Sequence, residues 1–105
     1  MARRFELAYA EVMYRHLASI EHRYHSLIRS AIEQQLQYEP NVRTPNRKPL
    51  VKPARFGEAW ELRLGPDNRF RVFYRIEEAL RQVRILAIAS KIRGKLCIAG
   101  REFIA

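Results

Sequence analysis

The stretch WELRLGPDNRFRVFYR, residues 60–75, predicts two strands joined by a turn. Apolar side chains occupy every second position on each side of GPDN, which is the pattern of strands with one buried face. Gly, Pro, Asp and Asn together are typical of a tight turn. This hairpin is therefore expected to anchor an antiparallel sheet, around which the rest of the chain can be placed.

The apolar positions also predict how the two strands pair. Burying both apolar sets on one face fixes the register, because a slip by one residue would turn one strand inside out. The expected pairs are Leu64 with Phe70, Leu62 with Val72, and Arg63 with Arg71. Two like charges facing each other destabilise a sheet by roughly several tenths of a kcal/mol. A bound phosphate would make this pair stabilising instead of destabilising, because neighbouring guanidinium groups bind its oxygens in a bidentate manner.

Other residues extend this positive face. Alternation along the second strand places Arg69, Arg71, Phe73 and Arg75 on the outer side. We expect Phe73, exposed among cations, to stack on a base. VRILAIA, residues 83–89, is apolar on both faces and therefore predicts the central strand of the sheet. Lys91 and Arg93 follow that strand directly and add to the same surface. The plainer alternative is a solvated surface in which Glu61 and either Glu77 or Glu78 neutralise the cations. An acidic protein segment fits the face nearly as well as RNA.

Length and composition predict one basic globular domain, residues 1–105. The chain is 48% hydrophobic and 10% aromatic, which argues against intrinsic disorder. Twenty Lys and Arg against 11 Asp and Glu leave a formal charge of +9. The expected partner is therefore a polyanion or a strongly acidic protein.

The single cysteine, Cys97, excludes an internal disulfide and indicates a reducing compartment. No apolar segment approaches the roughly 20 residues needed to span a bilayer, and MARRFEL does not resemble a signal peptide. We therefore expect a cytoplasmic protein with no membrane contact.

The N-terminal part predicts one strand followed by helix. RRFELAY alternates apolar and polar side chains, which indicates a strand over residues 3–9. Residues 10–38 carry apolar side chains at intervals of three and four, without Gly or Pro. Periodicity alone fits one long helix or two. We favour a helical hairpin that breaks at residues 19–21, with Ser19 as an internal N-cap, because a single helix of about 28 residues would be roughly 42 Å long.

The remainder predicts an extended connection and then strands. Residues 38–58 hold four of the five prolines and the cations Arg43, Arg47, Lys48, Lys52 and Arg55. Strands are expected over residues 60–64, 70–76 and 82–89, and KLCIAGREFI would supply a further one. The expected fold class is α+β: two N-terminal helices packed on one face of a small, mostly antiparallel sheet of four to five strands.

Three segments in this order resemble the RelE/ParE superfamily of type II toxin–antitoxin toxins: PNRKPL, WELRLGPDNRFRVFYRIEE and VRILAIASKIRGKLCIAGREF. The resemblance implies a compact sheet with two N-terminal helices and a cognate acidic antitoxin that wraps the toxin. For the RelE branch it implies cleavage of mRNA in the ribosomal A site, so that ribosome and mRNA are further partners. The chain departs from that pattern at Ile92, where a second cation is usual, and at Phe103, where a tyrosine is usual.

The resemblance implies catalytic roles for Arg63, Arg71 and Lys91. Arg71, with Arg63, would stabilise charge on the phosphorane, and Lys91 would act as base. The expected RNA-binding set is Arg69, Phe73, Arg75, Arg93, Arg47 and Lys48. Two other functions stay open: a ParE-like toxin that binds gyrase, and a non-catalytic nucleic-acid- or antitoxin-binding protein.

No metal or other cofactor is expected. His22 and His25 are three residues apart on a predicted helix, which lets two ligands share a face. No carboxylate or cysteine completes a ligand set near them, so packing or solvent-facing histidines are the expectation.

Overall fold

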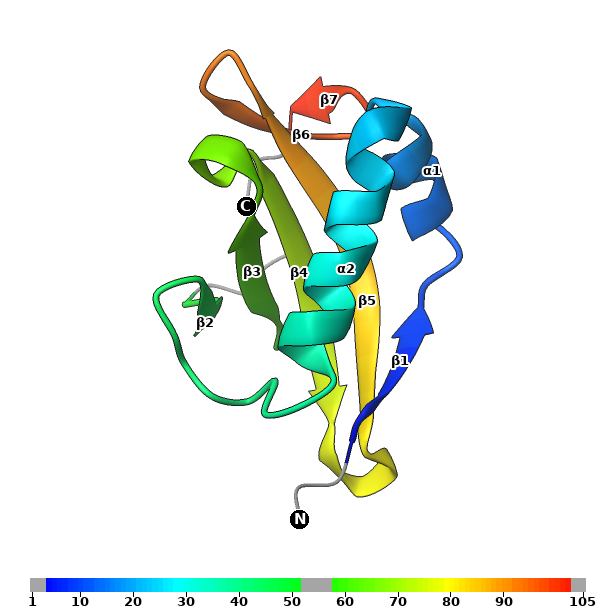
Figure 1. Ribbon diagram of the computed structural model, residues 1–105, viewed down its shortest axis with the longest axis vertical. Coiled ribbons are helices and arrows are strands. Elements are labelled where there is room, and N and C mark those ends of the chain that lie inside the picture. Colours follow the sequence, from blue (N-terminus) through cyan, green and yellow to red (C-terminus); the bar gives the residue numbers. More distant parts are fainter. Residues whose placement is uncertain (1–3, 52–57, 103–105) are drawn as a thin grey trace.

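The computed structural model describes residues 4–51 and 58–102, in which seven strands form one sheet with helices on one face (Figure 1). In chain order the elements are β1 (Glu6–Tyr9), α1 (Met13–Ala18), the 3-10 turn η1 (His22–Tyr24), α2 (His25–Leu36), β2 (Arg47–Pro49), β3 (Trp60–Leu64), the 3-10 turn η2 (Pro66–Asn68), β4 (Phe70–Glu77), the 3-10 turn η3 (Glu78–Leu80), β5 (Gln82–Ile92), β6 (Lys95–Ile98) and β7 (Arg101–Glu102).

The strand β5 organises the sheet. The strands lie in the order β2-β3-β4-β5-β6-β7 with antiparallel neighbours, and β1 pairs with β5 in parallel. The first half of β5 pairs with β1 and its end pairs with β6, on the side away from β4. Between these two partners, His16 of α1 takes the place of a strand, because its Nδ1 accepts a hydrogen bond from the backbone N–H of Ile88 at 3.3 Å. The prediction that β5 is a central strand is thus confirmed. On the side of β5 away from β4, the His16 side chain accepts the hydrogen bond that a neighbouring strand would otherwise accept.

The expectation of two N-terminal helices on a sheet of four to five strands is wrong. The sheet formed by the described residues has seven strands. α1 has only 6 residues and contacts β5, whereas the 12-residue α2 lies along the sheet and is entered directly from η1 (Figure 1). The chain does leave the helix at residues 19–21, but Ser19 is the C-cap of α1 and its hydroxyl donates to the carbonyl of His16 at 2.7 Å.

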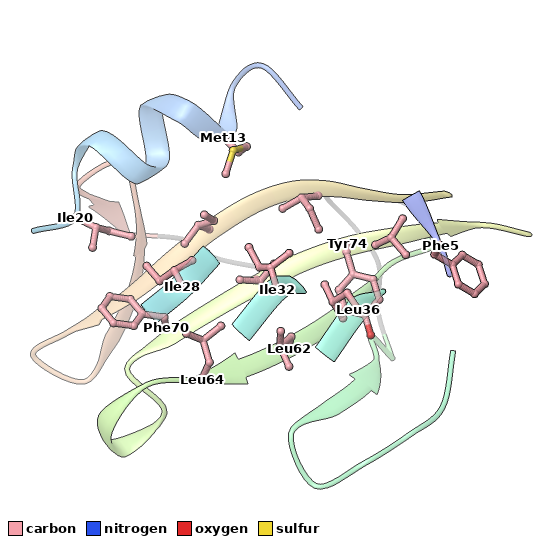
Figure 2. Close-up of a cluster of buried hydrophobic side chains, with 14 residues drawn as sticks. Phe5, Met13, Ile20, Ile28, Ile32, Leu36, Leu62, Leu64, Phe70 and Tyr74 are labelled. Atoms are coloured by element: carbon pink, nitrogen blue, oxygen red, sulfur yellow. The ribbon is translucent and has the colours of Figure 1, made fainter. Parts of the chain in front are cut away.

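The main core lies between α2 and the sheet (Figure 2). Ile28, Ile32 and Leu36 recur every four residues along α2, so they form one stripe, and all three are buried. They pack with inward-facing side chains of the strands, among them Leu62 and Phe70. This packing covers the inner face of the β3–β4 hairpin, and the opposite face of the hairpin is not covered by α2.

The predicted hairpin register is confirmed. Leu64 pairs with Phe70, Leu62 with Val72, and Arg63 with Arg71. β3 has the predicted bounds, β4 extends by one residue to Glu77 and β5 extends by three to Ile92. The pairing of β4 with β5 shifts between Phe73 and Tyr74.

Two strand regions were not predicted as such. β2 lies within residues 38–58, which were expected to be an irregular connection, and it pairs with β3. The run KLCIAGREFI holds two strands, β6 and β7, within its described part. Their hairpin turns, Arg93–Gly94 and Ala99–Gly100, have positive φ at both residues, which is the type I′ geometry that strand twist favours.

Gly65, between β3 and η2, is expected to tolerate no side chain. It has φ of +85°, and an added Cβ would lie 2.8 Å from a ring carbon of the buried Phe70. Gly65→Ala should therefore destabilise the fold by about 1–3 kcal/mol, through backbone strain and overpacking. Urea unfolding measures this, with Gly94→Ala as control: Gly94 has φ of +81° but open space around it. Equal losses for both variants would contradict a role for the contact with Phe70.

Candidate functional site

Arg63 and Arg71 face each other on the side of the sheet away from α2, as predicted. Glu61 lies between them. Its Oε1 is 3.2 Å from Nη1 of Arg71 and its Oε2 is 3.5 Å from Nε of Arg63. The like-charge pair is therefore stabilised by a carboxylate of the same hairpin, so the neutralising role considered for Glu61 is confirmed.

The three side chains differ in their access to solvent. Glu61 is 7% exposed, Arg71 is 11% and Arg63 is 35%. In the ladder Glu61 lies opposite Phe73 on β4 and opposite Lys48 on β2. Lys48 is exposed, so it adds a cation to this face at the β2 edge.

Lys91 lies on the same face, towards the end of β5. Arg71 pairs with Ala89, and two residues further along the strand alternation returns to that face at Lys91. Lys91 is exposed, and its backbone N–H donates to the carbonyl of Arg69 at 2.7 Å. Arg93 follows, exposed, at the tip of the β5–β6 hairpin with φ of +52°. The site thus consists of an arginine pair, a shared carboxylate and flanking lysines; we refer to Arg63, Arg71, Glu61, Lys48 and Lys91 as the basic face.

Phe73 cannot stack on a base in this structure. It lies on the predicted face but is only 1% exposed. Ala87, Ala89 and Ile98 bury it in a second, smaller core. Alternation alone could not show whether the Phe73 ring is exposed or buried. The apolar cluster around the ring packs beside the residues of the basic face.

Arg69 was placed on the wrong side of the sheet. It precedes β4 as the C-cap of η2, so strand alternation does not apply to it. Its Nη1 donates to the hydroxyl of Tyr24 at 3.1 Å, and its Nη2 lies 3.4 Å from Oε1 of Glu21. Arg69 therefore ties η2 to the connection between the helices.

Arg47 was expected to bind RNA but is buried, at 7% exposure. Its Nη1 donates to the carbonyl of Gln35, one residue before the end of α2. A cation there interacts favourably with the helix dipole and satisfies a free terminal carbonyl. Arg47 thus has a structural role.

Arg75 lies on the predicted face but is half-buried and opposite Arg84. The buried Phe73 separates it from the arginine pair along β4. Phe103, the departure from the family pattern at the C-terminus, and Lys52 and Arg55 lie outside the described residues.

Two solved structures have a similar fold. A chain of the toxin–antitoxin complex RelBE2 from Mycobacterium tuberculosis superposes with a TM-score of 0.67 at 22% identity, covering 88% of this chain and 94% of that one. A chain of the archaeal RelE–RelB complex from Pyrococcus horikoshii OT3 gives a TM-score of 0.56 at 21% identity, covering 85% and 97%. The fold is RelE-like. No protein-family model and no curated protein matches the chain.

Within the RelE-like fold, Tyr74 belongs to the main core and not to the basic face. It is fully buried on the α2 side of β4, and its hydroxyl donates to the carbonyl of Pro40 at 2.9 Å. Burial raises the pKa of Tyr74 well above the usual value, and the charge of Arg47 opposes this only in part. Tyr74 is therefore a core residue and holds the segment after α2.

The raised pKa of Tyr74 predicts a loss of stability in alkali. The folded state holds the proton more tightly than the unfolded state, so this contribution is fully present below about pH 10 and is lost as pH rises beyond it. Tyr74→Phe should cost about 0.5–1.5 kcal/mol at neutral pH, through the lost hydrogen bond. The cost should shrink between pH 10 and 12, as measured by urea unfolding. A cost that stays constant over that range would contradict the assignment.

A cleft of about 400 Å³ lies on the other side of the RelE-like fold, between α1 and α2. Tyr9, Tyr14, His22, His25 and Arg29 are among the residues that line it. None of the predicted catalytic or RNA-binding residues does, so the cleft and the basic face are separate features.

The described residues contain no group of three or more His, Cys, Asp or Glu side chains placed to hold a metal ion. The rings of His22 and His25 are 5.0 Å apart. Nε2 of His25 lies 2.8 Å from the carbonyl oxygen of Ile20, and this hydrogen bond occupies the nitrogen. In the same part of the chain no helix is long and apolar enough to cross a bilayer.

Proposed function

We propose that the protein is the toxin of a type II toxin–antitoxin pair and that it cleaves mRNA on the ribosome. The observation that carries this proposal is the facing pair Arg63 and Arg71 on a rigid hairpin, with Lys91 on the same face. The RelE-like fold supports it, because both solved neighbours are toxin–antitoxin complexes. The formal charge of +9 suits a polyanionic substrate and an acidic inhibitor.

The chemistry is an attack of a ribose 2′-oxygen on the adjacent phosphorus. The 2′-oxygen loses its proton to the base and bonds to phosphorus, and the bond from phosphorus to the 5′-oxygen breaks. The 5′-oxygen takes up a proton from water, which leaves a 2′,3′-cyclic phosphate and a 5′-hydroxyl. Charge accumulates on the phosphorane, where Arg71 and Arg63 would stabilise it. Lys91 would act as the base that takes the 2′-proton.

The remaining cations have supporting roles in this proposal. Lys48 and Arg93 flank the arginine pair from opposite edges of the site and would hold the RNA backbone on either side of the cut. Arg75 would contact a more distant phosphate. Because this chemistry needs translating ribosomes, the protein would act in the cytoplasm.

Induced expression followed by mapping of mRNA ends and of DNA breaks tests this function. We expect cuts inside translated codons that carry 5′-hydroxyl ends and are absent from a matched transcript that lacks a ribosome-binding site. Gyrase-dependent DNA breaks with intact mRNA would refute the nuclease and support a gyrase-binding toxin. Growth without either lesion would support a non-catalytic binding protein.

A further inference from the structure

Glu61 lies at the centre of the basic face, and the proposed chemistry does not use it. Its two oxygens contact different arginines, Oε1 at 3.2 Å from Arg71 and Oε2 at 3.5 Å from Arg63. A carboxylate shared in this way fixes the separation of two guanidinium groups that would otherwise repel each other. Since Glu61 is 7% exposed, little water reaches its carboxylate to screen these two contacts.

Arg71 has donor capacity that Glu61 does not use. Glu61 takes Nη1, whereas Nε is buried and makes no hydrogen bond to any residue in the ranges 4–51 and 58–102. A buried donor without a partner is unfavourable, so an incoming anion that reaches Nε would satisfy it. An anion and Glu61 would then share one guanidinium group, as a phosphate and a carboxylate can.

We propose that Glu61 is a positioning residue, an internal carboxylate that holds Arg63 and Arg71 at one spacing and limits their affinity for phosphate. The proposal rests on the proposed function for its substrate, an RNA phosphodiester. With Glu61 ionised, the three side chains carry one net positive charge instead of two. The ground-state phosphodiester, with one negative charge, is therefore held weakly, whereas the more highly charged phosphorane gains more from the fixed arginines.

The direct test is the binding of inorganic phosphate to Glu61→Gln, followed through the NMR signal of the Arg71 Nε–Hε group. Gln keeps the size of the side chain and one acceptor oxygen but removes the charge. Phosphate should bind about five- to tenfold more tightly than to the wild type. The matched control is Glu33→Gln, which makes the same charge change at an exposed position of α2 and should leave the affinity unchanged. An affinity for Glu61→Gln that equals or falls below that of the wild type would overturn the proposal.

Cleavage kinetics provide an independent readout. For Glu61→Gln both kcat and KM should fall, kcat by about tenfold, because binding tightens while the arginines lose their fixed spacing. The pH profile of kcat should keep its shape; loss of its acid limb would instead make Glu61 a general base and refute a positioning role. Glu61→Asp, which keeps the charge but is too short to span both arginines, should retain wild-type phosphate affinity with a lower kcat.

Failure of the proposed function would be recognised separately. If the wild type cleaves no RNA, that function falls, while the phosphate titration still decides the role of Glu61. If Glu61→Gln does not fold, Glu61→Asp carries the test: a kcat below that of the wild type at unchanged phosphate affinity supports the proposal, and a wild-type kcat contradicts it.

Discussion

Arg71→Ala is expected to slow mRNA cleavage by about 10²–10³-fold, the usual loss when one preorganised donor to a developing oxyanion is removed. Arg71 is the more buried of the two facing arginines, at 11% exposure against 35% for Arg63. The less exposed guanidinium acts at lower effective dielectric and should therefore contribute more. Single-turnover cleavage on programmed ribosomes measures the loss.

Two further variants separate this effect from unfolding and from lost charge. Arg71→Lys keeps a cation beside Glu61 but lacks the planar fork, so it should fold normally and still lose most activity. Arg84→Ala removes an exposed arginine from β5 and should change the rate by less than about threefold, since it lies beyond Phe73 from the pair. Similar losses for Arg71→Ala and Arg84→Ala would mean that Arg71 contributes only general positive charge.

Phe70→Ala is expected to destabilise the fold by about 3–5 kcal/mol. The ring is 0% exposed, lies 5.2 Å from the ring of Tyr24 and closes the core beneath Gly65. Its removal leaves a cavity at the start of β4, directly before Arg71. Equilibrium urea unfolding gives the free energy, and the midpoint should shift without a large change in the denaturant slope.

The matched control for Phe70→Ala is Leu80→Ala. Leu80 is also a large apolar residue, but it is 70% exposed at the end of η3, so its loss should stay within about 0.5 kcal/mol. A loss below about 1 kcal/mol for Phe70→Ala would show that the ring is not packed between η1 and β4.

The sequence predicts best where two constraints coincide. In β3 and β4 both apolar sets must be buried, so the register of Arg63 and Arg71 followed from alternation alone. β2 escaped prediction because three residues that include Pro49 carry no period, and only pairing with β3 makes them a strand. The sequence predicted one strand where the structure has β6 and β7, because the turn between them, Ala99–Gly100, lies inside an apolar run.

For the site, alternation predicted the face of the sheet on which a residue lies, but not whether other residues bury it there. Phe73 was correctly placed on the side of the arginines, and its burial depends on Ile98, which arrives from a distant hairpin. Arg47 and Arg69 looked equally free in the sequence, yet a helix terminus and a neighbouring tyrosine hold them. Glu61 was considered as one of several neutralising carboxylates; that it bridges both arginines depends on side-chain geometry that spacing does not contain.

The most direct test of the basic face as a nuclease site is primer extension on a defined mRNA in a reconstituted translation reaction with purified protein. We expect cuts in the codon at the ribosomal A site with the wild type, at least about 10²-fold slower cutting with Arg71→Ala, and no cuts when ribosomes are omitted. Intact mRNA in the presence of wild-type protein and stalled ribosomes would contradict the assignment of the basic face as a nuclease site.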